Sequence, residues 1–101
     1  MSLGDIQLRE KITGFILDLR MGGQDKKIDK NLYDGVISHI RRFKSENASR
    51  PEILKADAGI LFYLFESLLS EALHAKEPEP LNECAWAVSE EIRLVLKDSE
   101  G

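Results

Sequence analysis

The sequence predicts an all-α protein that folds as a single antiparallel four-helix bundle. Apolar residues recur with the 3.6-residue period of a helix along most of the 101 residues. No alternating run of β-branched residues indicates a strand. Three polar breaks divide the pattern into helices over about 5–21, 30–45, 50–75 and 80–98. Short connections of this kind favour antiparallel neighbours within one domain, over residues 1–101.

The first helix is expected to begin at Asp5, as its N-cap, and to end at Gly22-Gly23. One side of this helix is apolar, and we expect that side to be buried. The residues on it are Leu8, Ile12, Phe15, Ile16 and Leu19. A second, weaker apolar line lies off this face and consists of Ile6, Leu17 and Met21.

The second helix follows a polar, basic loop and is expected to begin near Asp29 or Asn31. Its apolar residues keep to one side, which is typical of an amphipathic helix with one buried face. They are Leu32, Tyr33, Val36, Ile37, Ile40 and Phe43. His39 lies at the edge of this face, so we expect a boundary position for it and no role as a ligand.

The third helix has a clear predicted start, because Ser49 and Glu52 fit a capping box with Pro51 in the first turn. The uncharged run from Ala58 to Phe65 is far shorter than the roughly 20 residues of a membrane span. A wide apolar arc predicts that this is the central helix of the bundle. The arc contains Leu54, Ala58, Leu61, Phe62, Leu64, Phe65, Leu68, Leu69, Ala72 and Leu73, and the polar side opposite contains Glu66, Ser67, Ser70, Glu71 and His74.

Two prolines, Pro78 and Pro80, end the third helix and precede the fourth. The fourth helix carries one apolar stripe, which we expect to face the core. The stripe consists of Leu81, Cys84, Ala85, Val88, Ile92, Val95 and Leu96.

Three large side chains project away from the predicted core: Ile60, Tyr63 and Trp86. Soluble proteins expose isolated apolar residues routinely, so these positions could be ordinary surface. Aromatic anchors also dominate the energetics of protein interfaces. We therefore expect these residues to join a surface that a second subunit or another protein covers.

The net charge of −4 conceals an uneven distribution. Residues 20–55 carry a net charge of +4, whereas residues 57–101 carry −7. Such a dipolar chain can steer a charged partner or pair with itself. Three basic residues, Arg41, Arg42 and Lys44, lie on the outer side of the second helix, where they either face solvent or contribute to binding an acidic protein. The acidic sequence, with a pI of about 5.2, disfavours nucleic-acid binding.

Glu71 and His74 form a Glu-x-x-His sequence, the spacing by which di-iron bundles place both side chains on one metal. Such a site needs a second copy of the motif, which only a symmetric dimer could supply here; otherwise the two residues lie on a solvated face. Cys84 lies on an apolar stripe and is expected to act as a small apolar side chain, not as a nucleophile. We predict no catalytic residue, no cofactor and no cofactor-binding residue, because the phosphate-binding and hydrolase motifs are absent from the sequence.

The single cysteine cannot form an intramolecular disulfide, which favours a reducing, cytoplasmic setting. Residues 1–3 and 100–101 resemble the short extensions that expression vectors add. The first residues do not show the basic, apolar and small-residue order of a secretory signal. We expect neither a signal peptide nor a transmembrane segment.

These features predict a small, non-catalytic helical module that acts through protein–protein contact and associates with itself as a homodimer. The order and length of the four helices resemble those of the small bacteriocin immunity proteins. That resemblance implies an alternative function, in which the chain binds and neutralises a toxin or peptide. A metal-dependent enzyme assembled across a dimer is the third alternative.

Overall fold

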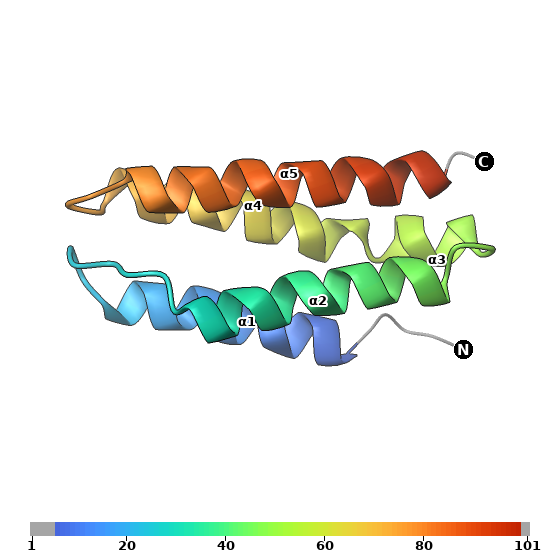
Figure 1. The fold of residues 1–101 in the computed structure, drawn as a ribbon, viewed down its shortest axis with the longest axis horizontal. Helices are drawn as coiled ribbons and strands as arrows, with labels where there is room; N and C mark the ends of the chain where they lie inside the picture. The colour runs from blue at the N-terminus through green and yellow to red at the C-terminus, as the bar shows by residue number, and fades with distance from the viewer. Residues whose placement is uncertain (1–5, 100–101) are drawn as a thin grey trace.

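The computed structural model describes residues 6–99 and shows an all-α bundle, which confirms the predicted fold class (Figure 1). The helices are α1 (Ile6–Met21), α2 (Lys30–Glu46), α3 (Pro51–Ala56), α4 (Ala58–Leu73) and α5 (Glu79–Ser99). The bounds of α1, α2 and α5 agree closely with the predicted ranges. The predicted N-cap at Asp5 and the terminal extensions at 1–3 and 100–101 lie outside the described residues.

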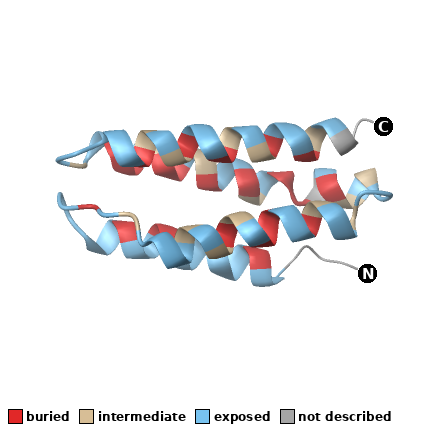
Figure 2. Ribbon diagram, in the orientation of Figure 1, coloured by how far each residue is buried: buried red, intermediate tan, exposed pale blue. Residues whose placement is uncertain are grey.

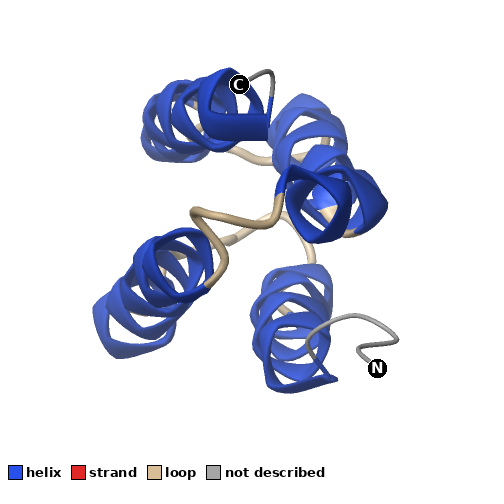
Figure 3. Ribbon diagram, turned by 90° about the vertical axis from the view of Figure 1, so that its right-hand side faces the viewer, coloured by secondary structure: helices blue, strands red, loops and turns tan. Residues whose placement is uncertain are grey.

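The long helices run up and down alternately around one interior (Figures 1 and 3). Helix α4 packs most extensively against α5 and also contacts α1, while α1 packs against α2 and α2 against α5. Helix α3 precedes α4 and contacts α5. The bundle is elongated, with dimensions of 42 × 21 × 19 Å.

Buried side chains lie on the inward sides of the helices (Figure 2). The predicted faces of the first, second and fourth helices supply much of this core, because one apolar stripe per helix can face a common interior. The fully buried residues of these three faces are Leu8, Ile12, Phe15, Ile16, Leu19, Val36, Ile40, Phe43, Leu81, Ala85, Val88 and Val95. His39, predicted at a boundary, is buried among them at 4% exposure.

The predicted continuous helix over 50–75 is wrong, because the chain interrupts it at Asp57 and ends it at Leu73. The Asp57 backbone turns to φ −98° and ψ 1°. Its side chain is buried, and Oδ1 accepts a hydrogen bond from Arg9 Nη2 at 3.2 Å. Aspartate is a poor residue for a helix interior, and this contact with α1 holds it at the break.

The predicted capping box at Ser49 and Glu52 does not form. The N-cap of α3 is Arg50, and its side chain makes no capping hydrogen bond. Pro51 occupies the first helical position, where its fixed φ and missing amide hydrogen are acceptable. The helix therefore begins one residue later than the capping box requires.

The buried face of α4 is rotated from the predicted arc. Phe62 is 42% exposed and Leu73 is 84% exposed, although both were expected in the core. Ser67 and Glu71, expected on the polar side, are buried, and Ile60 packs partly buried against the core. The reason is geometric: α5 and α1 cover two sides of α4, and their positions, not the width of the apolar arc, decide which residues are enclosed.

Two local features fix the connection between α1 and α2. Gly23 adopts φ 64° after the end of α1, a left-handed conformation that glycine accepts at little cost. Asp29 caps α2, because its Oδ1 accepts a hydrogen bond from the Leu32 amide at 3.1 Å. Among the described residues 6–99, no helix combines the length and the apolar character that crossing a membrane requires.

Candidate functional site

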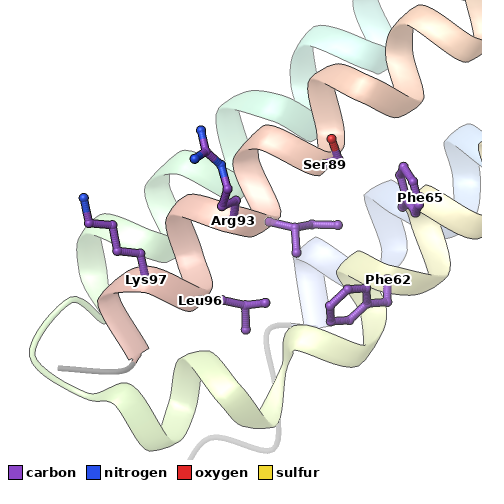
Figure 4. A pocket seen from close by; sticks show the side chains of 7 residues that line it. Phe62, Phe65, Ser89, Arg93, Leu96 and Lys97 are labelled. Atoms are coloured by element: carbon purple, nitrogen blue, oxygen red, sulfur yellow. The ribbon is translucent and has the colours of Figure 1, made fainter.

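An apolar groove runs between α4 and α5 near the start of α4 (Figure 4). Phe62 and Phe65 line it from α4, and Leu96 faces them from α5. Its volume is about 450 Å³, which is within the size range of small-ligand pockets and of pockets for single side chains. The remaining lining residues are Ser89, Ile92, Arg93 and Lys97. The groove is thus apolar inside and basic along its α5 rim.

Trp86 lies beside this groove and is 65% exposed. Its ring packs against Phe65 in an edge-to-face arrangement, with 6.2 Å between the ring centroids and 62° between the planes. This geometry is the favoured one for an aromatic pair and holds the indole in a defined place.

The groove continues into a longer apolar surface along α4. Phe62, Phe65, Leu69 and Leu73 follow a spacing of three or four residues, which places them on one side of the helix. Phe65 and Leu69 are half-buried, whereas Phe62 and Leu73 are exposed. We call these four residues together with Trp86 the α4/α5 face. An exposed surface of this kind on a bundle marks a site of interaction.

The predicted surface residues Ile60 and Tyr63 do not belong to this face. Ile60 packs against the core. Tyr63 lies on the side of α4 toward Arg20 of α1, whose pKa is raised first by its hydrogen bond to Glu71 and then by the nearby Tyr63 phenol. Of the three predicted anchors, Trp86 alone lies beside the groove.

The basic residues of α2 are engaged by other parts of the bundle. Arg41 forms a two-pronged contact with Glu91 of α5, with Nε–Oε1 at 3.2 Å and Nη2–Oε2 at 3.1 Å. This pairing raises the pKa of the Arg41 guanidinium. Arg42 Nη2 donates to Gln7 Oε1 at 3.3 Å, and Lys44 is half-buried. Arg41 and Arg42 thus fasten α2 to α5 and α1.

Glu71 binds two cations of this chain. Lys26 Nζ lies 2.9 Å from Oε1, and Arg20 Nε donates to Oε2 at 3.1 Å. The expectation that Glu71 faces solvent is therefore wrong, while His74 is exposed at the end of α4. Within residues 6–99 no group of three or more His, Cys, Asp and Glu side chains is arranged to hold a metal ion. Both Glu71 oxygens are used to connect α4 to α1 and its following loop.

Cys84 is half-buried on α5 beside Tyr33 of α2. Burial raises the pKa of the thiol, and the charge of Glu83 raises it further, against a smaller opposite effect of a hydrogen bond with Tyr33. Burial likewise raises the pKa of Tyr33 to about 12. Because a thiol must ionise to attack, these surroundings suit a packing role for Cys84.

Sequence reasoning missed Phe62, Phe65, Leu69 and Leu73 as surface residues by assigning all of them to the core. A signal was present, since the apolar arc of this helix covers about half its circumference. Two flanking helices enclose less than that, so part of the arc had to face outward. Comparisons with protein-family models, with curated proteins and with solved structures found no match to this chain.

Proposed function

We propose that this chain is a non-catalytic interaction module that binds a second copy of itself through the α4/α5 face. The observation that carries the proposal is the apolar groove of about 450 Å³ with the exposed Trp86 beside it. Tryptophan is among the residues that contribute most to binding when an interface buries them. Covering the groove and the indole removes apolar surface from water, which drives association.

The α4/α5 face is suited to binding because its anchors are held before a partner arrives. Phe65 and Leu69 are half-buried and pack against the core. Trp86 in turn packs on Phe65. A surface ordered in advance loses less conformational entropy on binding, so more of the contact energy appears as affinity.

The other two functions have weaker support. A metal centre at Glu71 would have to displace Lys26 and Arg20 from the carboxylate. A toxin-neutralising protein could use the same α4/α5 face, but it would bind a different protein there and not a second copy. The oligomeric state therefore separates the leading proposal from this alternative.

Sedimentation analysis over a range of protein concentrations tests the proposal. We expect the wild-type chain to form dimers, and we expect Trp86→Ala to raise the dimer dissociation constant at least about tenfold, because it removes the central anchor. Leu17→Ala is the matched control, since Leu17 is a 54% exposed apolar residue on α1. It should leave the dissociation constant unchanged.

Circular dichroism accompanies each variant. Trp86 is largely exposed, so its loss should leave the helix content intact. A wild-type chain that stays monomeric at every concentration would overturn the proposed self-association. In that case a monomer bound through Trp86 to another protein would favour the toxin-neutralising alternative.

A further inference from the structure

One side of α5 carries a regular row of exposed residues. They are Glu79, Glu83, Trp86, Glu90, Arg93 and Lys97. Successive members are separated by four or three residues, so all six lie on one side of the helix. We call this row the α5 stripe. It adjoins the groove, since Arg93 and Lys97 form the groove's basic rim.

Charge is ordered along the α5 stripe. Its first two members, Glu79 and Glu83, are acidic, and its last two, Arg93 and Lys97, are basic. At 1.5 Å per residue, the acidic and basic ends are about 27 Å apart. The positions are also symmetric about Val88, so that reversing the helix places each member of the stripe opposite another member.

From this symmetry we infer that the second copy lies antiparallel on the α4/α5 face, with a two-fold axis near Val88. This inference rests on the proposed self-association and adds its orientation. In that arrangement Glu83 lies opposite Arg93 of the second copy, and Glu79 lies opposite Lys97 of the second copy. Each pair occurs twice because of the symmetry, which gives four contacts between opposite charges.

The same arrangement brings Trp86 to the groove. Trp86 lies at the level of Glu90 of the second copy, where Phe65, Ser89 and Arg93 of that copy form the near end of the groove. The indole can enter between the aromatic wall and the basic rim, with Arg93 placed to contact its face. Each copy therefore offers an anchor and receives one, as a two-fold interface requires.

A parallel pairing of the same faces is disfavoured by charge. It would set Glu79 and Glu83 against their own copies at one end and Arg93 and Lys97 against theirs at the other. Like charges placed together in an interface cost several kcal/mol and exclude that arrangement. Opposite charges at the two ends of the stripe thus select the antiparallel orientation.

The size of the face also agrees with full-length antiparallel pairing. The bundle is 42 Å long and about 20 Å wide, so one side offers roughly 800 Å². That is about the area each partner buries in a stable interface of ordinary size. An overlap of only half the length would bury about half as much and would leave Trp86 or the groove uncovered.

Charge-reversal variants test the inferred orientation. Glu79→Lys combined with Glu83→Lys makes the α5 stripe basic at both ends, and Arg93→Glu combined with Lys97→Glu makes it acidic at both ends. Each double variant alone should raise the dimer dissociation constant at least about tenfold, because opposed charges become alike. A mixture of the two should form heterodimers with an affinity within about threefold of the wild type, since every opposed pair is again complementary.

The quadruple variant that carries all four reversals is the matched control. It exchanges the two ends of the stripe, so it should form homodimers as the wild type does. The milder pair of single variants, Glu83→Lys and Arg93→Glu, repeats the mixing experiment with the first turn of α5 unchanged. Native mass spectrometry identifies the heterodimer, and circular dichroism reports the fold of each variant.

The outcomes separate the orientation from the proposed function. Double variants that dimerise as tightly as the wild type, or a mixture that fails to recover, would overturn the antiparallel register while leaving self-association in place. A wild-type chain that is monomeric throughout would overturn the self-association itself. Recovery in both the mixture and the quadruple variant is the expected result.

Discussion

At the scale of single residues, Glu71 joins three segments of the bundle through one carboxylate. Lys26 Nζ also donates to the Leu19 carbonyl at 3.2 Å, so the loop after α1 is held against both α1 and α4. Burial alone would raise the pKa of Glu71, but the hydrogen bonds and charges of Lys26 and Arg20 outweigh it and lower the pKa. The ionised form is thus the one that the folded bundle stabilises.

Replacing this carboxylate by an amide should destabilise the protein in a pH-dependent way. Glu71→Gln leaves the buried Lys26 without its counter-charge, so we expect the free energy of unfolding at pH 7 to fall by about 3 kcal/mol. Because folding lowers the pKa, the stabilisation is complete above the unfolded value of about 4.3 and is lost as the pH falls through the folded value. The difference between wild type and variant should therefore shrink in acid below about pH 4.

Urea denaturation at neutral and acidic pH measures this difference. Glu10→Gln is the control, because Glu10 is an exposed carboxylate on α1. It should change the stability little at either pH. Equal stabilities of the wild type and Glu71→Gln at pH 7, or a difference that grows in acid, would contradict the account of Glu71.

At the scale of elements, the interruption between α3 and α4 is the main departure from regular helices. Asp57 turns the chain there, and its ion pair with Arg9 fixes the break against α1. Its second oxygen, Oδ2, is buried and makes no hydrogen bond to any of the described residues. The break therefore costs some stability, which the ion pair and the packing of Leu54 and Leu61 on either side offset.

Helix α1 contains a glycine that the structure does not require. A Cβ added at Gly14 would meet nothing within 4 Å, and the residue is exposed in the middle of the helix. We expect Gly14→Ala to stabilise the protein by about 0.5–1 kcal/mol, because alanine loses less backbone entropy on folding. Thermal denaturation should show a higher midpoint, by about 4 °C.

Gly23 provides the opposite case within the same helix-to-loop region. Its φ of 64° is strained for any residue with a side chain, so Gly23→Ala should lower the midpoint. Similar effects of the two substitutions would contradict this assignment of roles.

At the scale of the whole molecule, the bundle encloses one core and leaves the α4/α5 face in solvent. The opposite charges at the two ends of the α5 stripe make this face complementary to its own reversed copy. Stability and association are then linked, because a dimer that forms only from folded chains favours the folded state by mass action.

The melting temperature should consequently depend on protein concentration. Over about a hundredfold increase in concentration, we expect the wild-type midpoint to rise by about 5 °C. Trp86→Ala should reduce this dependence, since it weakens association. Differential scanning fluorimetry with calorimetric confirmation measures both proteins. A wild-type midpoint that is independent of concentration would argue against linkage to a dimer.

The sequence by itself determined the all-α class, the number of long helices and the buried faces of three of them. Those faces, such as Leu8 to Leu19 on α1, are single narrow stripes, and a narrow stripe has only one way to be buried. The sequence also indicated that Trp86 lies outside the core. It showed the ordered charges of the last helix, although their meaning depends on where that helix lies.

Only the tertiary structure decided how α4 is used. Its apolar arc is wider than its neighbours can cover, so periodicity alone cannot say which half is enclosed. The placement of α5 and α1 leaves Phe62 and Leu73 outside and Glu71 inside. Likewise, Asp57 breaks the helix because of Arg9, a residue 48 positions earlier in the chain. Interactions between distant segments determine both outcomes, and a local sequence pattern does not contain them.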